Sequence, residues 1–262
     1  MKLEVLRAAP AQPGRGAPLL FVHGAFSAAW CWAEHFLPYF ADRGYDCYAV
    51  SLRGHGASEG SDQIHAHGLR DYVDDVARVV DSMPVKPVLV GHSMGGMVIQ
   101  HYLDHADVPA AVLMASVPPS GLFGPSVDLA WRDPSFFGQM GLIQYANPGF
   151  ATVEGLRRVL FSRRADDSVV AKTFARMQPE SQRAICDMTW PRLRLRRRRL
   201  PPLLVLGAEH DAFFRPHAVH ATAGHLGVEA EIIPGMAHAM MLEPDWQRVA
   251  DRIHRWLAEI GF

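Results

Sequence analysis

The chain has 262 residues and a mass of 29.0 kDa, which allows one domain with a sizeable core and excludes a peptide hormone or a small disulfide scaffold. Hydrophobic residues make up 49% and charged residues 20%, so the composition does not predict disorder, and the net charge of -1 provides no overall field to hold a nucleic acid. Three cysteines without paired spacing predict neither a disulfide framework nor a zinc site.

The amino-terminal residues bear on where the protein works. Lys2, Glu4 and Arg7 place charges where a signal peptide would have its apolar core. The longest apolar runs fall far short of the roughly 20 residues that span a bilayer. We therefore expect a cytoplasmic protein without a transmembrane segment, whose oligomeric state stays open.

Short runs rich in Val, Leu and Ala alternate with amphipathic stretches, a pattern typical of an α/β protein with a mostly parallel sheet flanked by helices. A leading strand over 2–8 is expected to pair antiparallel at the sheet edge. Further strands are predicted near 19–23, 45–51, 87–91, 110–116, 202–207 and 229–233. Helices are predicted over 30–42, 70–82, 94–106, 215–225 and 244–259, where apolar residues recur at helical spacing.

One long interval interrupts this alternation, because about eighty residues separate two predicted strands where a single helix would need far fewer. Residues 118–199 are rich in large apolar side chains and are predicted to form a helical cap inserted into a core of residues 1–117 and 200–262. The later part is basic, with 13 Lys and Arg against 5 Asp and Glu in residues 151–200. We interpret the run from Arg196 to Arg199 as a solvated face, with attraction of an acidic substrate or an anionic membrane as the alternative.

A strand-to-helix turn carries the first candidate for chemistry. Gly91-His92-Ser93-Met94-Gly95-Gly96 follows a predicted strand and precedes a predicted helix. Gly91 and Gly95 lack side chains where neighbouring backbone must pass closely, which lifts the Ser93 hydroxyl above the sheet. Because the helix N-terminus points its free N–H groups at an anion formed there, Ser93 is the candidate nucleophile and Met94 a candidate oxyanion donor.

A serine nucleophile needs a base, and the base needs an acid to orient it. Asp211 follows the strand over 202–207, and His238 follows the strand over 229–233. Loops after parallel strands meet at one edge of a sheet, so the order Ser93, Asp211, His238 predicts a catalytic triad. Glu209 is the nearest competitor for the acid, and Asp128 is a weaker one.

The remaining candidates concern the oxyanion and the substrate. The strand over 19–23 ends in His23-Gly24, which makes the backbone N–H of Ala25 the second candidate oxyanion donor. Phe26 and Phe213 are predicted to bind substrate, whereas Trp30 and Trp32 are predicted to serve the core first. Apolar cap residues are expected to line part of an apolar pocket. No cofactor and no metal are expected, because the pairs His65/His67 and His217/His220 lack further ligands.

These motifs together resemble the α/β-hydrolase superfamily in its serine esterase and lysophospholipase-like members. The resemblance spans nearly the whole chain outside the cap and rests on His23-Gly24 and on the segments 51–58, 91–96, 207–211 and 235–243. It implies the α/β-hydrolase fold, with Ser93 resembling the nucleophile, Asp211 the acid and His238 the base.

The resemblance also implies that Ala25 and Met94 supply the oxyanion hole. Many relatives have Asp where Ser51 stands and Gly where Ala237 stands, but neither departure touches the triad. The turn from Arg53 to Gly56 is structural in relatives, so His55 receives no chemical role.

Three functions are compatible with these residues. The leading hypothesis is a serine hydrolase that cleaves a carboxylic ester of a small or lipid-like molecule through an acyl-enzyme. Lyase, C–C hydrolase or perhydrolase chemistry on the same fold is an alternative, and a non-catalytic protein that binds a small ligand is another. Epoxide hydrolases and dehalogenases are disfavoured, because their relatives carry a carboxylate where Ser93 stands.

Overall fold

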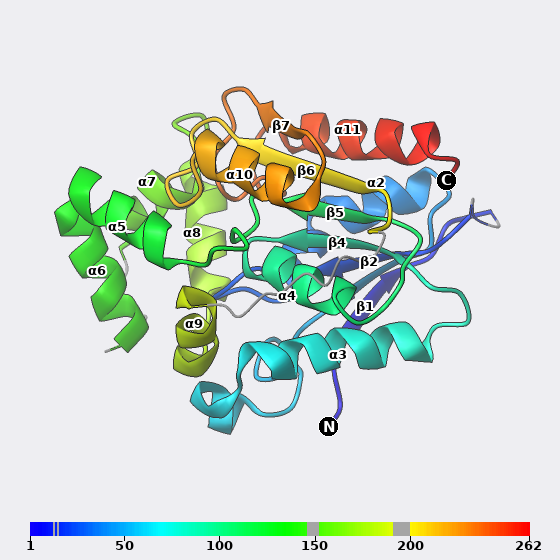
Figure 1. Cartoon of the computed structure of the whole chain (residues 1–262), viewed down its shortest axis with the longest axis horizontal. Coiled ribbons are helices and arrows are strands. Elements are labelled where there is room, and N and C mark those ends of the chain that lie inside the picture. Colours follow the sequence, from blue (N-terminus) through cyan, green and yellow to red (C-terminus); the bar gives the residue numbers. More distant parts are fainter. Residues whose placement is uncertain (13, 15, 146–151, 191–199) are drawn as a thin grey trace.

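The computed structural model describes residues 1–12, 14, 16–145, 152–190 and 200–262, and its centre is a seven-stranded sheet (Figure 1). The strand order is β1-β3-β2-β4-β5-β6-β7, and every neighbouring pair is parallel except β1 with β3. The strands are β1 (Val5–Ala8), β2 (Leu19–Val22), β3 (Cys47–Val50), β4 (Val88–His92), β5 (Ala111–Met114), β6 (Leu203–Ala208) and β7 (Ala230–Ile233).

Helices connect the strands and cover both faces of the sheet. Those outside the long β5–β6 connection are α1 (Trp30–Ala33), α2 (Phe36–Asp42), the 3-10 helix η1 (Ser61–Ala66), α3 (Leu69–Ser82), α4 (Met94–Leu103), α10 (Pro216–Leu226) and α11 (Trp246–Glu259). Figure 1 shows α3, α4 and α10 on the face toward the viewer, with α2 and α11 on the opposite face. The predicted fold class is confirmed, including the antiparallel edge strand, where Val5 pairs with Val50.

The predicted helix over 30–42 is wrong in one respect, because it is two helices. The chain leaves the helical conformation at His35, where φ is -139° and ψ is -49°. Pro38 explains the break: its ring has no N–H and collides with the carbonyl four residues earlier, at Glu34, so it is tolerated only in the first turn of a new helix.

The core consists of two layers, one on each face of the sheet. Leu19 and Phe21 of β2 pack with α1, α2 and α11, whereas Leu20 and Val22 pack with α3, α4 and α10. Side chains alternate in direction along a strand, so a four-residue strand buried on both faces contributes equally to the two layers. This burial holds the strands rigidly and therefore fixes the loops at their ends.

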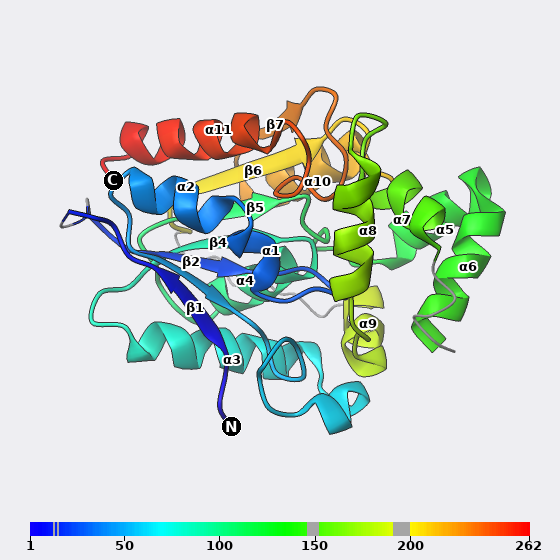
Figure 2. The ribbon, with the colours of Figure 1, turned by 180° about the vertical axis from the view of Figure 1, so that it is seen from behind.

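The connection between β5 and β6 contains five helices in its described residues, and we call residues 118–199 the β5–β6 segment. These helices are α5 (Phe123–Arg132), α6 (Pro134–Tyr145), α7 (Val153–Leu160), α8 (Asp167–Arg176) and α9 (Gln182–Thr189). Both views show them grouped beyond one end of the sheet (Figure 2). The run from Arg196 to Arg199 lies outside the described residues, and the division into core and cap stays a prediction.

Candidate active site

The predicted site residues come from four loops at one edge of the sheet. Strands β2, β4, β6 and β7 are mutually parallel through their neighbours, so their carboxyl ends point the same way. Gly24 follows β2, Ser93 follows β4, Asp211 follows β6 and His238 follows β7. Ligand sites of open α/β sheets form at this edge.

Ser93 occupies a strained turn between β4 and α4. Its φ of 53° and ψ of -115° lie in a region that residues with a side chain rarely adopt. The turn is held by hydrogen bonds from Ser93 N to the Met114 carbonyl (3.0 Å) and from Val117 N to the Ser93 carbonyl (3.1 Å). A Cβ on Gly95 would lie 2.3 Å from the Val22 carbonyl oxygen, which explains why glycine is required there.

His238 and Asp211 are hydrogen-bonded to each other. Nδ1 of His238 lies 2.8 Å from Oδ2 of Asp211, and both side chains are almost fully buried. The other carboxylate oxygen accepts the backbone N–H groups of Phe213 (2.8 Å) and Phe214 (2.9 Å). Since a carboxylate oxygen accepts, this contact places a proton on His238 Nδ1 and leaves Nε2 as the ring atom that could accept a proton from the nucleophile.

The two competitors for the acid lie elsewhere. Glu209 is exposed and accepts the backbone N–H of Gly235 at 2.7 Å. Asp128 is on α5, where it pairs with Arg132 one turn later. Neither carboxylate shares a hydrogen bond with His238, whereas Asp211 does.

The predicted oxyanion donors flank Ser93. Met94 is the first residue of α4, so its N–H is among those that a helix cannot satisfy internally. Gly24 approaches the turn so closely that a Cβ there would lie 3.0 Å from the Ser93 Cβ. Gly24, Ala25 and Met94 all line the cavity that also contains Ser93 and His238.

That cavity has a volume of about 610 Å³. Both predicted substrate-binding residues, Phe26 and Phe213, line it, and the Phe213 ring packs edge-on to His238 with centroids 4.9 Å apart. The side of the cavity formed by the β5–β6 segment is mostly apolar and includes Leu122, Leu129, Phe136, Leu156, Val159, Met177 and Met188. Trp30 lines the cavity as well, whereas Trp32 is fully buried in the core as predicted.

Sequence reasoning missed His92, the residue before Ser93. Its Nε2 lies 2.9 Å from the backbone carbonyl of His238, and the two rings are 4.7 Å apart. Burial, together with the nearby His238, lowers the pKa of His92 well below its ordinary value. The ring is therefore neutral, and the contact to a carbonyl requires its proton on Nε2.

Within the described ranges, no three His, Cys, Asp or Glu side chains come together in a way that could hold a metal ion. None of the described helices has both the length and the apolar character needed to cross a membrane.

Comparison with known proteins gives one family. The model of the alpha/beta hydrolase family matches residues 19–252, which confirms the resemblance noted in the sequence. Among curated proteins, the "Putative non-heme bromoperoxidase BpoC" of Mycobacterium tuberculosis is 33% identical over 106 residues, which are 39% of each chain. The match thus spans about two fifths of the length of that relative.

Solved structures match over nearly the whole chain. A "putative aryl esterase" from Burkholderia cenocepacia has a TM-score of 0.76 at 26% identity, covering 98% of this chain and 94% of that one. A thermophilic esterase from Thermogutta terrifontis has a TM-score of 0.73 at 20% identity, covering 99% and 94%.

Proposed function

Because the chain belongs to the alpha/beta hydrolase family, we propose that it is a serine hydrolase that cleaves a carboxylic ester through an acyl-enzyme on Ser93. The observation that carries this proposal is the hydrogen bond between His238 and Asp211, 2.8 Å long, with His238 in the wall of the same cavity as Ser93. A buried imidazole with its Nδ1 proton held by a carboxylate has the tautomer that a general base requires.

The proposed reaction has two halves. Ser93 Oγ bonds to the ester carbonyl carbon while its proton passes to His238 Nε2, and the N–H groups of Ala25 and Met94 hold the resulting oxyanion. The bond to the alcohol oxygen then breaks, and the alcohol leaves with the proton from His238. Water attacks the acyl-enzyme in the same way, its proton passes through His238 back to Ser93, and the carboxylic acid is released.

The cavity favours an apolar acyl or alkyl group. Its wall includes aliphatic, aromatic and methionine side chains of the β5–β6 segment. Pockets of this kind bind by burying apolar surface, with a few polar groups fixing orientation. We accordingly propose that residues 118–199 form a cap that selects the substrate, a small-molecule ester.

Hydrolysis of a p-nitrophenyl ester series from acetyl to palmitoyl tests the proposal. We expect turnover to peak at one chain length and to be lost in Ser93→Ala. Ser82→Ala is the matched control, because Ser82 is exposed at the end of α3. A fluorophosphonate should label the wild type and Ser82→Ala but not Ser93→Ala. Ester turnover that survives in Ser93→Ala would contradict the proposal.

A second candidate rests on the curated relative named as a non-heme bromoperoxidase. If hydrogen peroxide replaces water in the second half of the reaction, a carboxylic acid and peroxide give a peracid and water from the same acyl-enzyme. Bromination of a dye that requires both peroxide and an added carboxylic acid, and that disappears in Ser93→Ala, would favour this candidate.

A further inference from the structure

A buried carboxylate lies where the β5–β6 segment meets the sheet edge. Glu180 connects α8 to α9, and its side chain is completely inaccessible to solvent. One carboxylate oxygen accepts Tyr72 OH (2.8 Å) and Ser181 N (2.7 Å), and the other faces Nε2 of His55 (3.1 Å). A buried carboxylate is costly unless its oxygens are satisfied in this way.

The partner of Glu180 is a protonated histidine. Nδ1 of His55 lies 3.0 Å from the Arg53 carbonyl, and Nε2 faces the carboxylate. Because both neighbours are acceptors only, both ring nitrogens must donate, which makes the ring an imidazolium. Burial lowers the pKa of His55, but the charge and hydrogen bond of Glu180 outweigh it and raise the pKa above its ordinary value.

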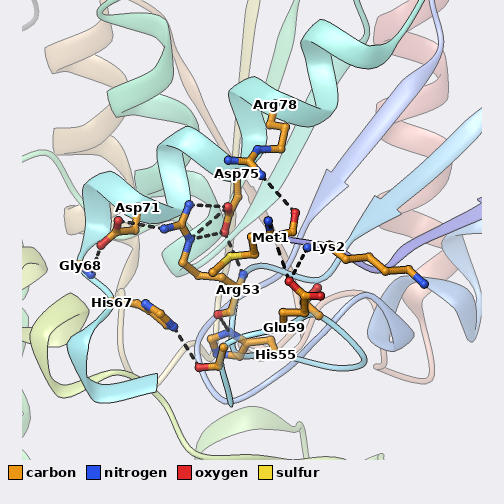
Figure 3. Close-up of polar contacts among 12 residues, drawn as sticks. Met1, Lys2, Arg53, His55, Glu59, His67, Gly68, Asp71, Asp75 and Arg78 are labelled. Carbon is orange, nitrogen blue, oxygen red and sulfur yellow. Dashed lines mark hydrogen bonds and ion pairs between the residues drawn. The ribbon is translucent and has the colours of Figure 1, made fainter. Parts of the chain in front are cut away.

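The loop that carries His55 is held firmly to α3. The Arg53 guanidinium forms ion pairs with Asp75 (2.7 Å) and Asp71 (2.9 Å), and Asp75 also accepts Arg53 N at 2.9 Å (Figure 3). Asp75 is completely buried. Figure 3 shows His55 beneath this cluster, linked to the Arg53 backbone. These contacts fix the backbone next to His55 and therefore the position of its charged ring.

Glu180 also contacts the loop after β2, residues 23–26, which carries the proposed oxyanion donor Ala25 and which we call the oxyanion loop. The oxygen that faces His55 accepts Phe26 N at 3.3 Å, and Gln178 N donates to the Phe26 carbonyl at 3.1 Å. The Gln178 side chain in turn bonds both Gly54 O (2.9 Å) and Gly56 N (2.8 Å) beside His55. Phe26 has a φ of 62°, which a residue with a side chain keeps only when its surroundings impose it.

His23 holds the other end of the oxyanion loop. Burial and the charge of His55 lower the pKa of His23 to about 3, so its ring is neutral. Its Nε2 accepts Leu52 N at 3.0 Å, which places the ring proton on Nδ1, where it donates to the Gly24 carbonyl at 2.8 Å. Ala25 thus lies between two peptide groups that are each fixed by side chains.

We infer that the Glu180–His55 pair is a positioning device that ties the β5–β6 segment to the oxyanion loop and sets the direction of the Ala25 N–H. Glu180 does not touch the substrate; it acts through Phe26. This inference rests on the proposed function, because an oxyanion donor matters only if Ser93 forms a tetrahedral intermediate. It gives the β5–β6 segment a part in the chemistry as well as in substrate choice.

The test is Glu180→Gln, which keeps the size of the side chain and removes its charge. We expect kcat to fall by about tenfold to a hundredfold with KM within about twofold, the pattern of an interaction used in the transition state. A trifluoromethyl ketone, which forms a tetrahedral adduct on serine, should lose affinity by the same factor. A merely structural role would not move the affinity for this ketone in step with kcat.

Asp187→Asn is the matched control. Asp187 also joins the β5–β6 segment to the core, by accepting Leu69 N at 3.0 Å, but it has no contact with the oxyanion loop in the described residues. Its kcat should stay at the wild-type value. An unchanged kcat in Glu180→Gln, or an equal loss in Asp187→Asn, would overturn the inference while leaving the proposed function intact. If the wild type shows no Ser93-dependent turnover, both are lost.

If Glu180→Gln does not fold, a milder variant tests the positioning role of the Glu180–His55 pair. Tyr72→Phe removes one hydroxyl from the network and keeps the ring in place. We expect a twofold to fivefold fall in kcat, again matched by the ketone affinity. A Tyr72→Phe variant with wild-type kcat and ketone affinity would then overturn the inference.

Discussion

His92 donates through Nε2 to the backbone carbonyl of His238, 2.9 Å away, so the residue before the candidate nucleophile holds the loop of the candidate base. The other nitrogen of the ring faces Gly24, where a Cβ would approach it to 2.8 Å. One neutral ring therefore contacts the loops after β2 and β7 while belonging to β4. Such a contact fixes the relative positions of the three site loops.

We predict that this contact matters more for turnover than for binding. His92→Gln can keep an N–H near the position of Nε2, whereas His92→Asn is too short. We expect His92→Asn to lower kcat about tenfold and His92→Gln to stay within about threefold, because small displacements of a catalytic group are costly. Steady-state kinetics on the preferred ester measures both. Equal losses in the two variants would mean that ring packing, and not the hydrogen bond, is responsible.

Kinetics can distinguish Asp211, the proposed acid of the triad, from Glu209, the other candidate for this role. Asp211→Asn cannot hold the Nδ1 proton of His238 as a carboxylate does, so kcat should fall about a thousandfold or more. Glu209→Gln should keep wild-type kcat, because the Glu209 carboxylate is exposed and bonds the backbone at Gly235. Side-by-side kinetics on one ester distinguishes them, and a larger loss in Glu209→Gln would reverse the assignment.

The positions of Ser93, Asp211 and His238 could be predicted because each residue lies in the loop or turn that comes after a strand. Alternation and the glycines at 91 and 95 locate the strand ends, and the parallel sheet brings those ends to one edge. The family match and the solved structures confirm the fold on which this reasoning depends.

The roles of His92 and Glu180 depend on contacts that no local pattern encodes. His92 meets a carbonyl 146 positions later, and Glu180 meets His55 across 125 positions. The sequence predicted 118–199 as an insertion but contained no signal for which of its residues would contact the sheet edge. The break at His35, by contrast, has a local cause in Pro38, and proline spacing could have predicted it.

A methyl group at Gly95 should be costly for folding. Its Cβ would lie 2.3 Å from the Val22 carbonyl oxygen and 2.6 Å from that of His23, and neither backbone group can rotate away. We expect Gly95→Ala to lower the free energy of unfolding by about 2–3 kcal/mol, as overpacking does in a tight core.

Gly224 provides the matched control for Gly95. It is exposed in α10 with no atom near the Cβ position, so Gly224→Ala should raise the free energy of unfolding by about 0.5–1 kcal/mol. Urea denaturation followed by circular dichroism measures both variants. If Gly95→Ala is as stable as the wild type, the close approach of α4 to β2 is not as the structure has it.

The Glu180–His55 pair makes stability depend on pH with a definite sign. Burial alone would lower the pKa of His55 and raise the pKa of Glu180. The charge and hydrogen bond of the partner outweigh this effect of burial, so the pKa of His55 is raised and the pKa of Glu180 is lowered. The contribution of His55 to stability is then fully present below its ordinary pKa of about 6.5 and is lost as pH rises through its folded pKa. The contribution of Glu180 is present above its ordinary pKa of about 4.3 and is lost as pH falls through its folded pKa.

The two contributions overlap between about pH 4.5 and 6.5, so the pair stabilises the fold most in that window. We expect the difference in free energy of unfolding between the wild type and His55→Gln to be largest near pH 6 and to shrink toward pH 9. Urea titrations at several pH values measure this difference, and taking it between two proteins cancels the groups that they share. His105→Gln, at a histidine whose side chain is 70% exposed, should show a much flatter profile. A wild-type advantage over His55→Gln that grows toward pH 9 would mean that His55 is neutral in the folded protein, against the two acceptors that its ring faces.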